Sequence, residues 1–138
     1  TAGNTKVKAI LGVGDLETLR NVAKASLVCM MAGADFIKTS TGKESTNANL
    51  NNSLVMLRMI RDFYSKTGKK IGFKPAGGIS TSKSVLEFLI LVAEELGFEW
   101  INPKLLRIGA SSLLIDIERQ LYHYTSGRYA NKEKLAIG

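Results

Sequence analysis

Two lysines stand where amine chemistry could take place. Lys38 and Lys74 each lie near the end of a short apolar run, and small or polar residues follow each of them. A free lysine has a pKa of about 10.4, so its amine is protonated and poorly nucleophilic at neutral pH. A second positive charge close by favours the neutral amine, which can attack an aldehyde and form a Schiff base. The pair therefore indicates covalent chemistry on a carbonyl compound.

The order of residues along the two runs predicts that both lysines lie on one face of a sheet. Alternate residues of a strand share a face, so Phe36 lies with Lys38, and Gly72 lies with Lys74. At a separation of about 7 Å and an effective dielectric of about 20, the two ammonium groups would repel by roughly 2.4 kcal/mol. The alternative is that each lysine ends its strand and extends into solvent.

Small residues after the strands form candidate anion-binding turns. Residues 77–78 are both glycine, and residues 109–112 are Gly-Ala-Ser-Ser; each turn follows an apolar run and precedes a predicted helix. Small residues let backbone N–H groups approach an oxyanion, and the dipole of the following helix favours negative charge. Lys43 can add a positive charge from a neighbouring loop. Either turn alone is compatible with an ordinary tight turn capped by serine, but the set together favours a phosphate site.

The elements that must position these residues alternate along the chain. The strands are continuous apolar runs, a pattern typical of a parallel sheet covered by helices. Two architectures fit, an open doubly wound sheet or part of a (β/α)8 barrel, and a full barrel takes about 250 residues. The predicted strands are 6–13, 35–39, 70–74 and 105–108. The first predicted helix follows Asp15, the second spans about 49–66, and the third begins at Thr81 or Ser82. The fourth begins near Leu113, with Ile117, Leu121 and Tyr124 on its inner face.

Composition limits the classes of function. A chain of 138 residues with 45% hydrophobic residues predicts a single domain over 1–138, with residues 1–5 and 126–138 expected to be flexible. The net charge of +7 is spread along the chain and is not clustered, so neither nucleic acid nor a membrane is an expected partner. Cys29 is the only cysteine, which favours a reducing, cytoplasmic setting. Glu94 and Glu95 are interpreted as part of a solvated face.

Three stretches of the chain resemble the deoxyribose-phosphate aldolase family. They are residues 34–43 (ADFIKTSTGK), 72–79 (GFKPAGGI) and 107–112 (RIGASS). The resemblance runs along essentially the whole chain but covers only the C-terminal half of the family. It implies an α/β fold of the TIM (β/α)8 barrel type, of which this chain holds about four C-terminal βα units, a half-barrel.

The family carries out class I aldolase chemistry without cofactor or metal. The resemblance implies the reversible cleavage of 2-deoxy-D-ribose 5-phosphate to acetaldehyde and D-glyceraldehyde 3-phosphate, in deoxyribonucleotide catabolism. It implies that Lys38 forms the Schiff base and that Lys74 tunes it. The residues that it assigns to the phosphosugar substrate and its phosphate are Thr41, Gly42, Lys43, Gly77, Gly78, Ser111 and Ser112.

Two departures from the family pattern carry consequences. The family's proton-transferring aspartate belongs to an earlier strand that these residues do not include, so weak or no activity is expected of this chain alone. Ser80 stands where many members carry arginine, which implies weaker phosphate affinity. Homo-oligomerisation, or association with the missing N-terminal half, is expected to cover the exposed edges of a half-barrel. The alternatives are a non-catalytic phosphate-binding half-barrel and another phosphosugar lyase or isomerase.

Overall fold

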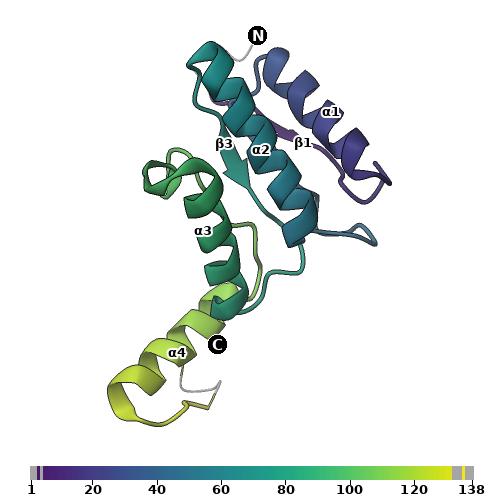
Figure 1. Ribbon diagram of the computed structural model, residues 1–138. Helices are drawn as coiled ribbons and strands as arrows, with labels where there is room; N and C mark the ends of the chain where they lie inside the picture. Colours follow the sequence, from purple (N-terminus) through teal and green to yellow (C-terminus); the bar gives the residue numbers. More distant parts are fainter. Residues whose placement is uncertain (1–2, 4, 132–134, 136–138) are drawn as a thin grey trace.

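The fold is an alternation of short parallel strands and longer helices (Figure 1). The computed structural model describes residues 3, 5–131 and 135. Of the two end segments expected to be flexible, residues 1–2, 4, 132–134 and 136–138 lie outside the described residues. The elements are β1 (Lys8–Ile10), α1 (Leu19–Met31), β2 (Phe36–Lys38), α2 (Leu50–Thr67), β3 (Gly72–Lys74), α3 (Ser82–Leu96), a 3-10 turn η1 (Phe98–Trp100) and α4 (Leu113–Ser126).

The three strands form a parallel sheet in the order β1-β2-β3. Helices α1 and α2 lie side by side against it (Figure 1). Ile37 and Phe73 are fully buried beneath the helices, where they join Met56, Leu57 and Ile60 of α2 in the main core. Because successive residues of a strand face opposite sides, their neighbours Phe36, Lys38 and Lys74 lie on the other face of the sheet. None of the helices in the described part of the chain is long and apolar enough to cross a membrane.

The boundaries of the helices follow local capping. Asn49 caps α2 by accepting a hydrogen bond from Asn52 N, and Gly68 ends the helix in the left-handed conformation with φ of 69°. Thr81 caps α3 in the same way, as one of the two predicted starts. The prediction for Asp15 is wrong, because Thr18 is the cap of α1. Asp15 instead lies in a turn in which its N–H donates to the carbonyl of Gly12.

The predicted fourth strand at 105–108 lies in the expected place beside β3, but it is not a regular strand. Two isolated bridges join it to the β3 segment, at Leu106 and at Gly109. Phe73 N donates to Leu105 O at 2.8 Å, and Gly109 N donates to Pro75 O at 2.8 Å. A regular ladder would also need a donor on Pro75, and proline has no backbone N–H. Pro75 therefore interrupts the pairing at its middle.

Helix α4 is present as predicted, but its apolar stripe is not packed. Leu113 is buried at its first turn, whereas Leu121 is 61% exposed and Tyr124 is 89% exposed. Figure 1 shows why, since α4 extends past the end of α3 and away from the sheet. Asp116 joins the two helices by accepting hydrogen bonds from the N–H of Ser82 at 2.7 Å and from its hydroxyl at 2.6 Å.

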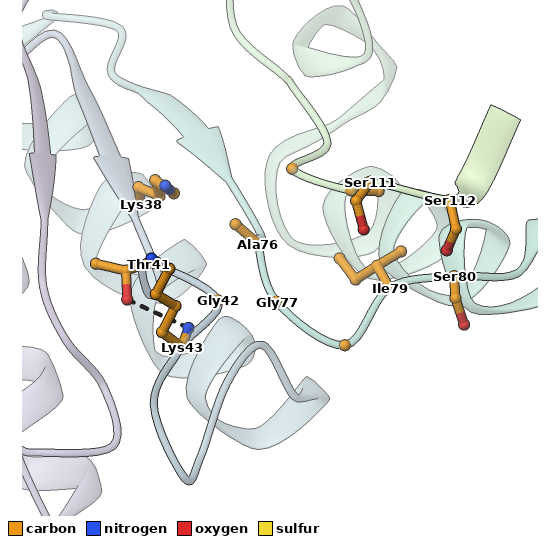
Figure 2. A pocket seen from close by; sticks show the side chains of 13 residues that line it. Lys38, Thr41, Gly42, Lys43, Ala76, Gly77, Ile79, Ser80, Ser111 and Ser112 are labelled. Atoms are coloured by element: carbon orange, nitrogen blue, oxygen red, sulfur yellow. Dashed lines mark hydrogen bonds between the residues drawn. The ribbon is translucent and has the colours of Figure 1, made fainter.

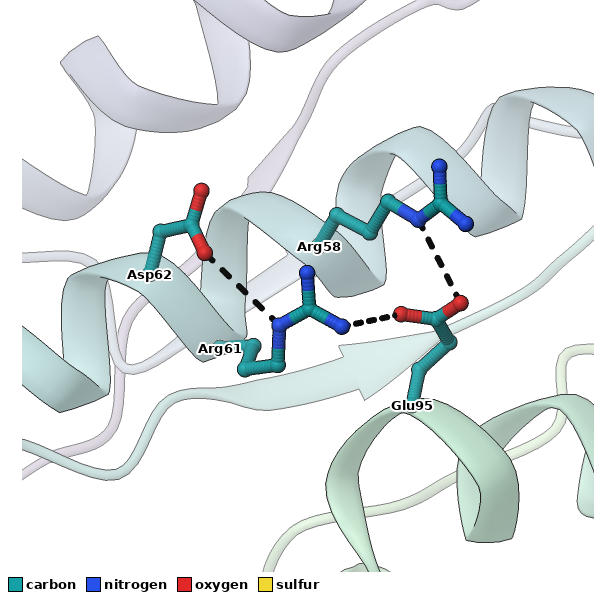
Figure 3. A network of polar contacts seen from close by, with 4 residues as sticks. All are labelled: Arg58, Arg61, Asp62 and Glu95. Carbon is teal, nitrogen blue, oxygen red and sulfur yellow. Dashed lines mark hydrogen bonds and ion pairs between the residues drawn. The ribbon is translucent and has the colours of Figure 1, made fainter.

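The interpretation of Glu95 as a solvated residue is wrong. Its side chain is only 13% exposed and accepts from two arginines of α2, Arg58 at 3.3 Å and Arg61 at 2.7 Å. Figure 3 shows this carboxylate of α3 between the two guanidinium groups. Arg61 also contacts Asp62 at 3.7 Å on its own helix. The network joins α2 to α3 over the outside of the core.

We predict that the Asp116→Asn variant loses about 1 kcal/mol of unfolding free energy at neutral pH, because a charge-assisted hydrogen bond becomes a neutral one. Hydrogen bonds from Ser82 lower the pKa of Asp116 below 3.8. The native contribution is therefore complete above pH 3.8 and is lost as the pH falls through the lower folded value. Urea unfolding of wild type and variant should converge in acid. Glu94→Gln, an exposed change on α3, serves as the control, and an equal loss at every pH would contradict the prediction.

Candidate active site

The sheet places the two lysines side by side. Lys38 of β2 and Lys74 of β3 are direct partners in the parallel register. Ile37 and Phe73 occupy the core side of the same strands, so both amines lie on the opposite face. The predicted shared face is confirmed.

The charge environment of the pair acts on Lys74. Burial of the amine is the largest cause that lowers the pKa of Lys74 below 10.5. The positive charges of Lys8, Lys38 and Arg107 lower that pKa further. A less basic amine exchanges its proton more readily near neutral pH. The structure thus places an amine of lowered pKa beside Lys38.

A cavity of about 420 Å³ opens next to Lys38, at the ends of β2 and β3 (Figure 2). Three loops form its walls, the loops after β2 and β3 and the loop that leads into α4. Among the predicted site residues, all except Lys74 line this cavity: Lys38, Thr41, Gly42, Lys43, Gly77, Gly78, Ser111 and Ser112. Ser80 lines it as well. The cavity is therefore lined by two lysines, Lys38 and Lys43, together with glycines and residues that carry hydroxyl groups.

Glycine is required at two positions of the cavity wall. Gly77 has φ of 93°, and a Cβ atom there would lie 2.4 Å from Oδ1 of Asn47. A Cβ atom at Gly109 would lie 2.5 Å from that of Ala76 and 3.0 Å from Cε of Lys74. The first glycine lets the turn close against Asn47, and the second leaves space for the stem of the lysine.

Buried hydroxyls, which were missed from the sequence, hold the glycine turn in place. Thr39 Oγ1 accepts from Ala76 N at 2.9 Å and lies 3.0 Å from Ala76 O, to which it donates. The hydroxyl of Ser40 lies 2.7 Å from Ala76 O and 2.9 Å from Asn47 Oδ1. Both side chains are fully buried. The available signal was two hydroxyl residues directly after an apolar strand, where the chain is still inside the fold.

The loop after β2 is closed by Glu44, another residue that the sequence did not single out. Its Oε1 accepts from the N–H of Thr41 at 2.9 Å and from the Thr41 hydroxyl at 3.1 Å. The N–H of Lys43 donates to the same hydroxyl at 3.3 Å, as Figure 2 shows. These bonds fix the backbone from which the Lys43 side chain extends along the cavity.

The arrangement brings together the amine of Lys38, the neighbouring amine of Lys74, and glycine and serine turns whose N–H and hydroxyl groups can donate to an oxyanion. Among the residues that the structure describes, no cluster of three or more His, Cys, Asp or Glu side chains could hold a metal ion. The individual roles of the site residues stay predictions.

Sequence comparison supplies the family. Residues 6–114 match the DeoC/LacD family aldolases. The chain belongs to this family. It is 65% identical over 128 residues to deoxyribose-phosphate aldolase of Mus musculus and 63% identical to that of Homo sapiens, with 93% of this chain and 40% of each relative covered. The chain thus spans about 40% of the length of these curated relatives.

Comparison with solved structures agrees with the fold. The apo form of a putative deoxyribose-phosphate aldolase from Toxoplasma gondii matches with a TM-score of 0.76 at 23% identity, over 92% of this chain and 48% of that one. A putative deoxyribose-phosphate aldolase from Coccidioides immitis matches with a TM-score of 0.63 at 26% identity, over 80% and 37%. The predicted fold class, an α/β fold that forms part of a TIM barrel, is confirmed.

We predict that Thr39→Val weakens the glycine turn, because the buried N–H of Ala76 loses its acceptor. The expected cost is about 1–3 kcal/mol of unfolding free energy. Thr39→Ser keeps the hydroxyl and is the matched control. Chemical denaturation of the two variants measures the difference. Equal stability of the valine and serine variants would show that the hydroxyl does not support the turn.

Proposed function

We propose that this chain is the C-terminal part of a class I aldolase that reversibly cleaves 2-deoxy-D-ribose 5-phosphate to acetaldehyde and D-glyceraldehyde 3-phosphate, a step of deoxyribonucleotide catabolism. The observation that carries the proposal is the register of Lys38 against Lys74, directly beside the cavity with its glycine and serine turns. The high identity to the mouse and human deoxyribose-phosphate aldolases supports the choice of substrate.

In this proposal the neutral amine of Lys38 attacks the aldehyde carbon of the open-chain sugar and expels water to form the Schiff base. The protonated imine withdraws electrons while the C2–C3 bond breaks and the C3 hydroxyl loses its proton. Glyceraldehyde 3-phosphate leaves, and the enamine left on Lys38 takes up a proton at its terminal carbon. Water then releases acetaldehyde. Lys74, whose pKa is lowered, tunes this amine from the neighbouring strand.

The phosphate of the sugar would occupy the end of the cavity away from Lys38. Gly78 offers a backbone N–H group there, Gly77 donates its own N–H to Gly109 O and shapes the turn, and Ser111 and Ser112 offer hydroxyls at the start of α4. Gly42 and Lys43 close the opposite wall, with Thr41 beside the reacting carbons. Ser80 contributes a hydroxyl but no charge, so this phosphate site depends on Lys43 for its positive side chain.

The proposal includes a structural partner. Within the described residues β1 pairs only with β2, and β3 has only the interrupted segment beyond it. Unpaired strand edges are readily covered by another chain. The rest of the barrel, or a second copy of this chain, is the partner that these edges fit. A small phosphosugar is the only other partner proposed.

The half-buried, single Cys29 supports a reducing cytoplasmic setting.

A non-catalytic phosphate-binding half-barrel is the second candidate. The cavity is lined by lysines, hydroxyls and small residues, and no carboxylate or imidazole is among the described residues that line it. A site of this composition binds phosphate even where the base for the C3 hydroxyl is missing. Covalent trapping separates this candidate from the aldolase.

We predict that borohydride reduction in the presence of acetaldehyde attaches an ethyl group to Lys38. The experiment uses the chain alone and the chain co-expressed with the N-terminal part of the mouse relative, with peptide mass mapping. Lys38→Arg should abolish the adduct, whereas Lys24→Arg, an exposed change on α1, should retain it. No adduct in the assembled protein, together with tight phosphate binding, would reject the aldolase and favour the second candidate.

We predict that the chain alone sediments as an oligomer, because its sheet edges and its exposed apolar side chains favour association. With the N-terminal part of the mouse relative, a one-to-one complex should replace this species. Analytical ultracentrifugation measures both. A single monomeric species at all concentrations, with no complex on mixing, would contradict the proposed partner.

A further inference from the structure

An aromatic ring occupies the centre of the sheet face that carries the lysines. Phe36 of β2 pairs with Gly72 of β3, and a Cβ atom at Gly72 would lie only 2.2 Å from Cε1 of the ring. The ring therefore lies across the position that a side chain of β3 would otherwise fill. Phe36 is 3% exposed, so its place is set by close packing.

Two cations lie over this ring, one from β1 and one from the segment beyond β3. Nζ of Lys8, on β1, lies 5.7 Å from the ring centroid, and Cζ of Arg107 lies 5.0 Å from it. Lys8 is the register partner of Phe36. Arg107 follows Leu106, which bridges to Phe73, so it stands beside Lys74. The face of an aromatic ring attracts cations at these distances. Phe36 thus holds one positive charge on each flank of the lysine pair.

These charges act on Lys74 from every element beside it. Lys8 acts from β1, Lys38 from β2, and Arg107 from the segment beyond β3. Burial is the largest cause of the lowered pKa of Lys74. Among the three charges, that of Lys8 lowers this pKa most, ahead of the register partner Lys38. Lys8 therefore acts on Lys74 at least as strongly as the register partner Lys38 does, and its ammonium group lies against the Phe36 ring.

We propose that Lys8 and Arg107 are positioning residues for the lysine pair, and that Phe36 holds their charges where they favour the neutral amine of Lys74. The neutral amine of Lys74 has a free electron pair, so it can accept a proton beside Lys38 during the reaction and then becomes the ammonium ion. The role in the reaction rests on the proposed aldolase function, whereas the effect on Lys74 does not.

The test follows the titration of Lys74 by NMR of the 138-residue chain labelled with ¹³C at lysine Cε, with Lys74→Arg used to assign the signal. Lys8→Met and Arg107→Met should each move the midpoint upward, by up to about one pH unit, because each removes a positive charge that lowers the pKa of Lys74. Lys8→Met should give the larger shift. Phe36→Leu should give a smaller shift in the same direction, because released cations move into water and are screened.

Two variants serve as controls. Lys70→Met removes a lysine that lies 4.8 Å from the Trp100 ring, away from this face, and should leave the midpoint of Lys74 unchanged. Arg107→Lys keeps the charge and should restore most of the wild-type value. Because Arg107 is exposed, its variants are expected to fold, and circular dichroism checks this for each protein.

The outcomes separate this inference from the proposed function. An unchanged Lys74 midpoint in folded Lys8→Met and Arg107→Met overturns the inference, whatever the activity. A shifted midpoint supports it, even if Lys38 forms no adduct with acetaldehyde and the aldolase proposal fails. In the assembled aldolase, the acidic limb of the pH profile of kcat/KM should move upward in Lys8→Met, and a fall in kcat/KM with no change of profile would also overturn it.

Discussion

The in-register pairing of β2 with β3 is the constraint on which the site depends. Strand residues alternate between two faces, so a shift of one residue in either strand would exchange its core and site residues. Ile37 and Phe73 are fully buried, which makes such a shift costly. The burial of two apolar side chains thus fixes the separation of two amines on the other face, although no side chain bonds one lysine to the other.

The same pairing continues into the loops. Thr39 and Ser40 follow β2 directly and reach Ala76, which follows β3. The part of the cavity wall at Ala76 is therefore tied to β2 through short buried hydrogen bonds. Gly72 and Phe36 show a similar fit on the sheet face that carries the lysines. Gly72 has no side chain, and this leaves room for the ring of Phe36 on the neighbouring strand. Small residues in this sheet are places where a neighbouring group must fit.

Sequence patterns predicted the parts of the structure that are set locally or by period. Helices α2 and α3 end at Gly68 and Gly97 as expected, and the two lysines share a face as the strand period requires. The resemblance of the motifs supplied the family, and the grouping of most of the expected site residues around one cavity agrees with it.

Features that depend on distant parts of the chain could not be read in the same way. The pairing beyond β3 is interrupted at Pro75, because a regular ladder needs a backbone N–H donor there and proline has none. Glu95 is an ion-pair partner only because α2 places Arg58 and Arg61 opposite it. An apolar stripe predicts a buried face, but Leu121 of α4 is mostly exposed. The hydroxyls of Thr39 and Ser40 acquire their importance only when Ala76 is brought next to them.

The attachment of α4 has a mechanical consequence. The helix is anchored at its near end, by burial of Leu113 and by the bonds from Ser82 to Asp116, and this end adjoins the cavity through Ser111 and Ser112. Its far turns extend away from the sheet (Figure 1). A movement or a substitution at the far end of α4 is therefore not transmitted to the serine hydroxyls. The outer half of the helix can change in sequence while the rim of the cavity keeps its shape.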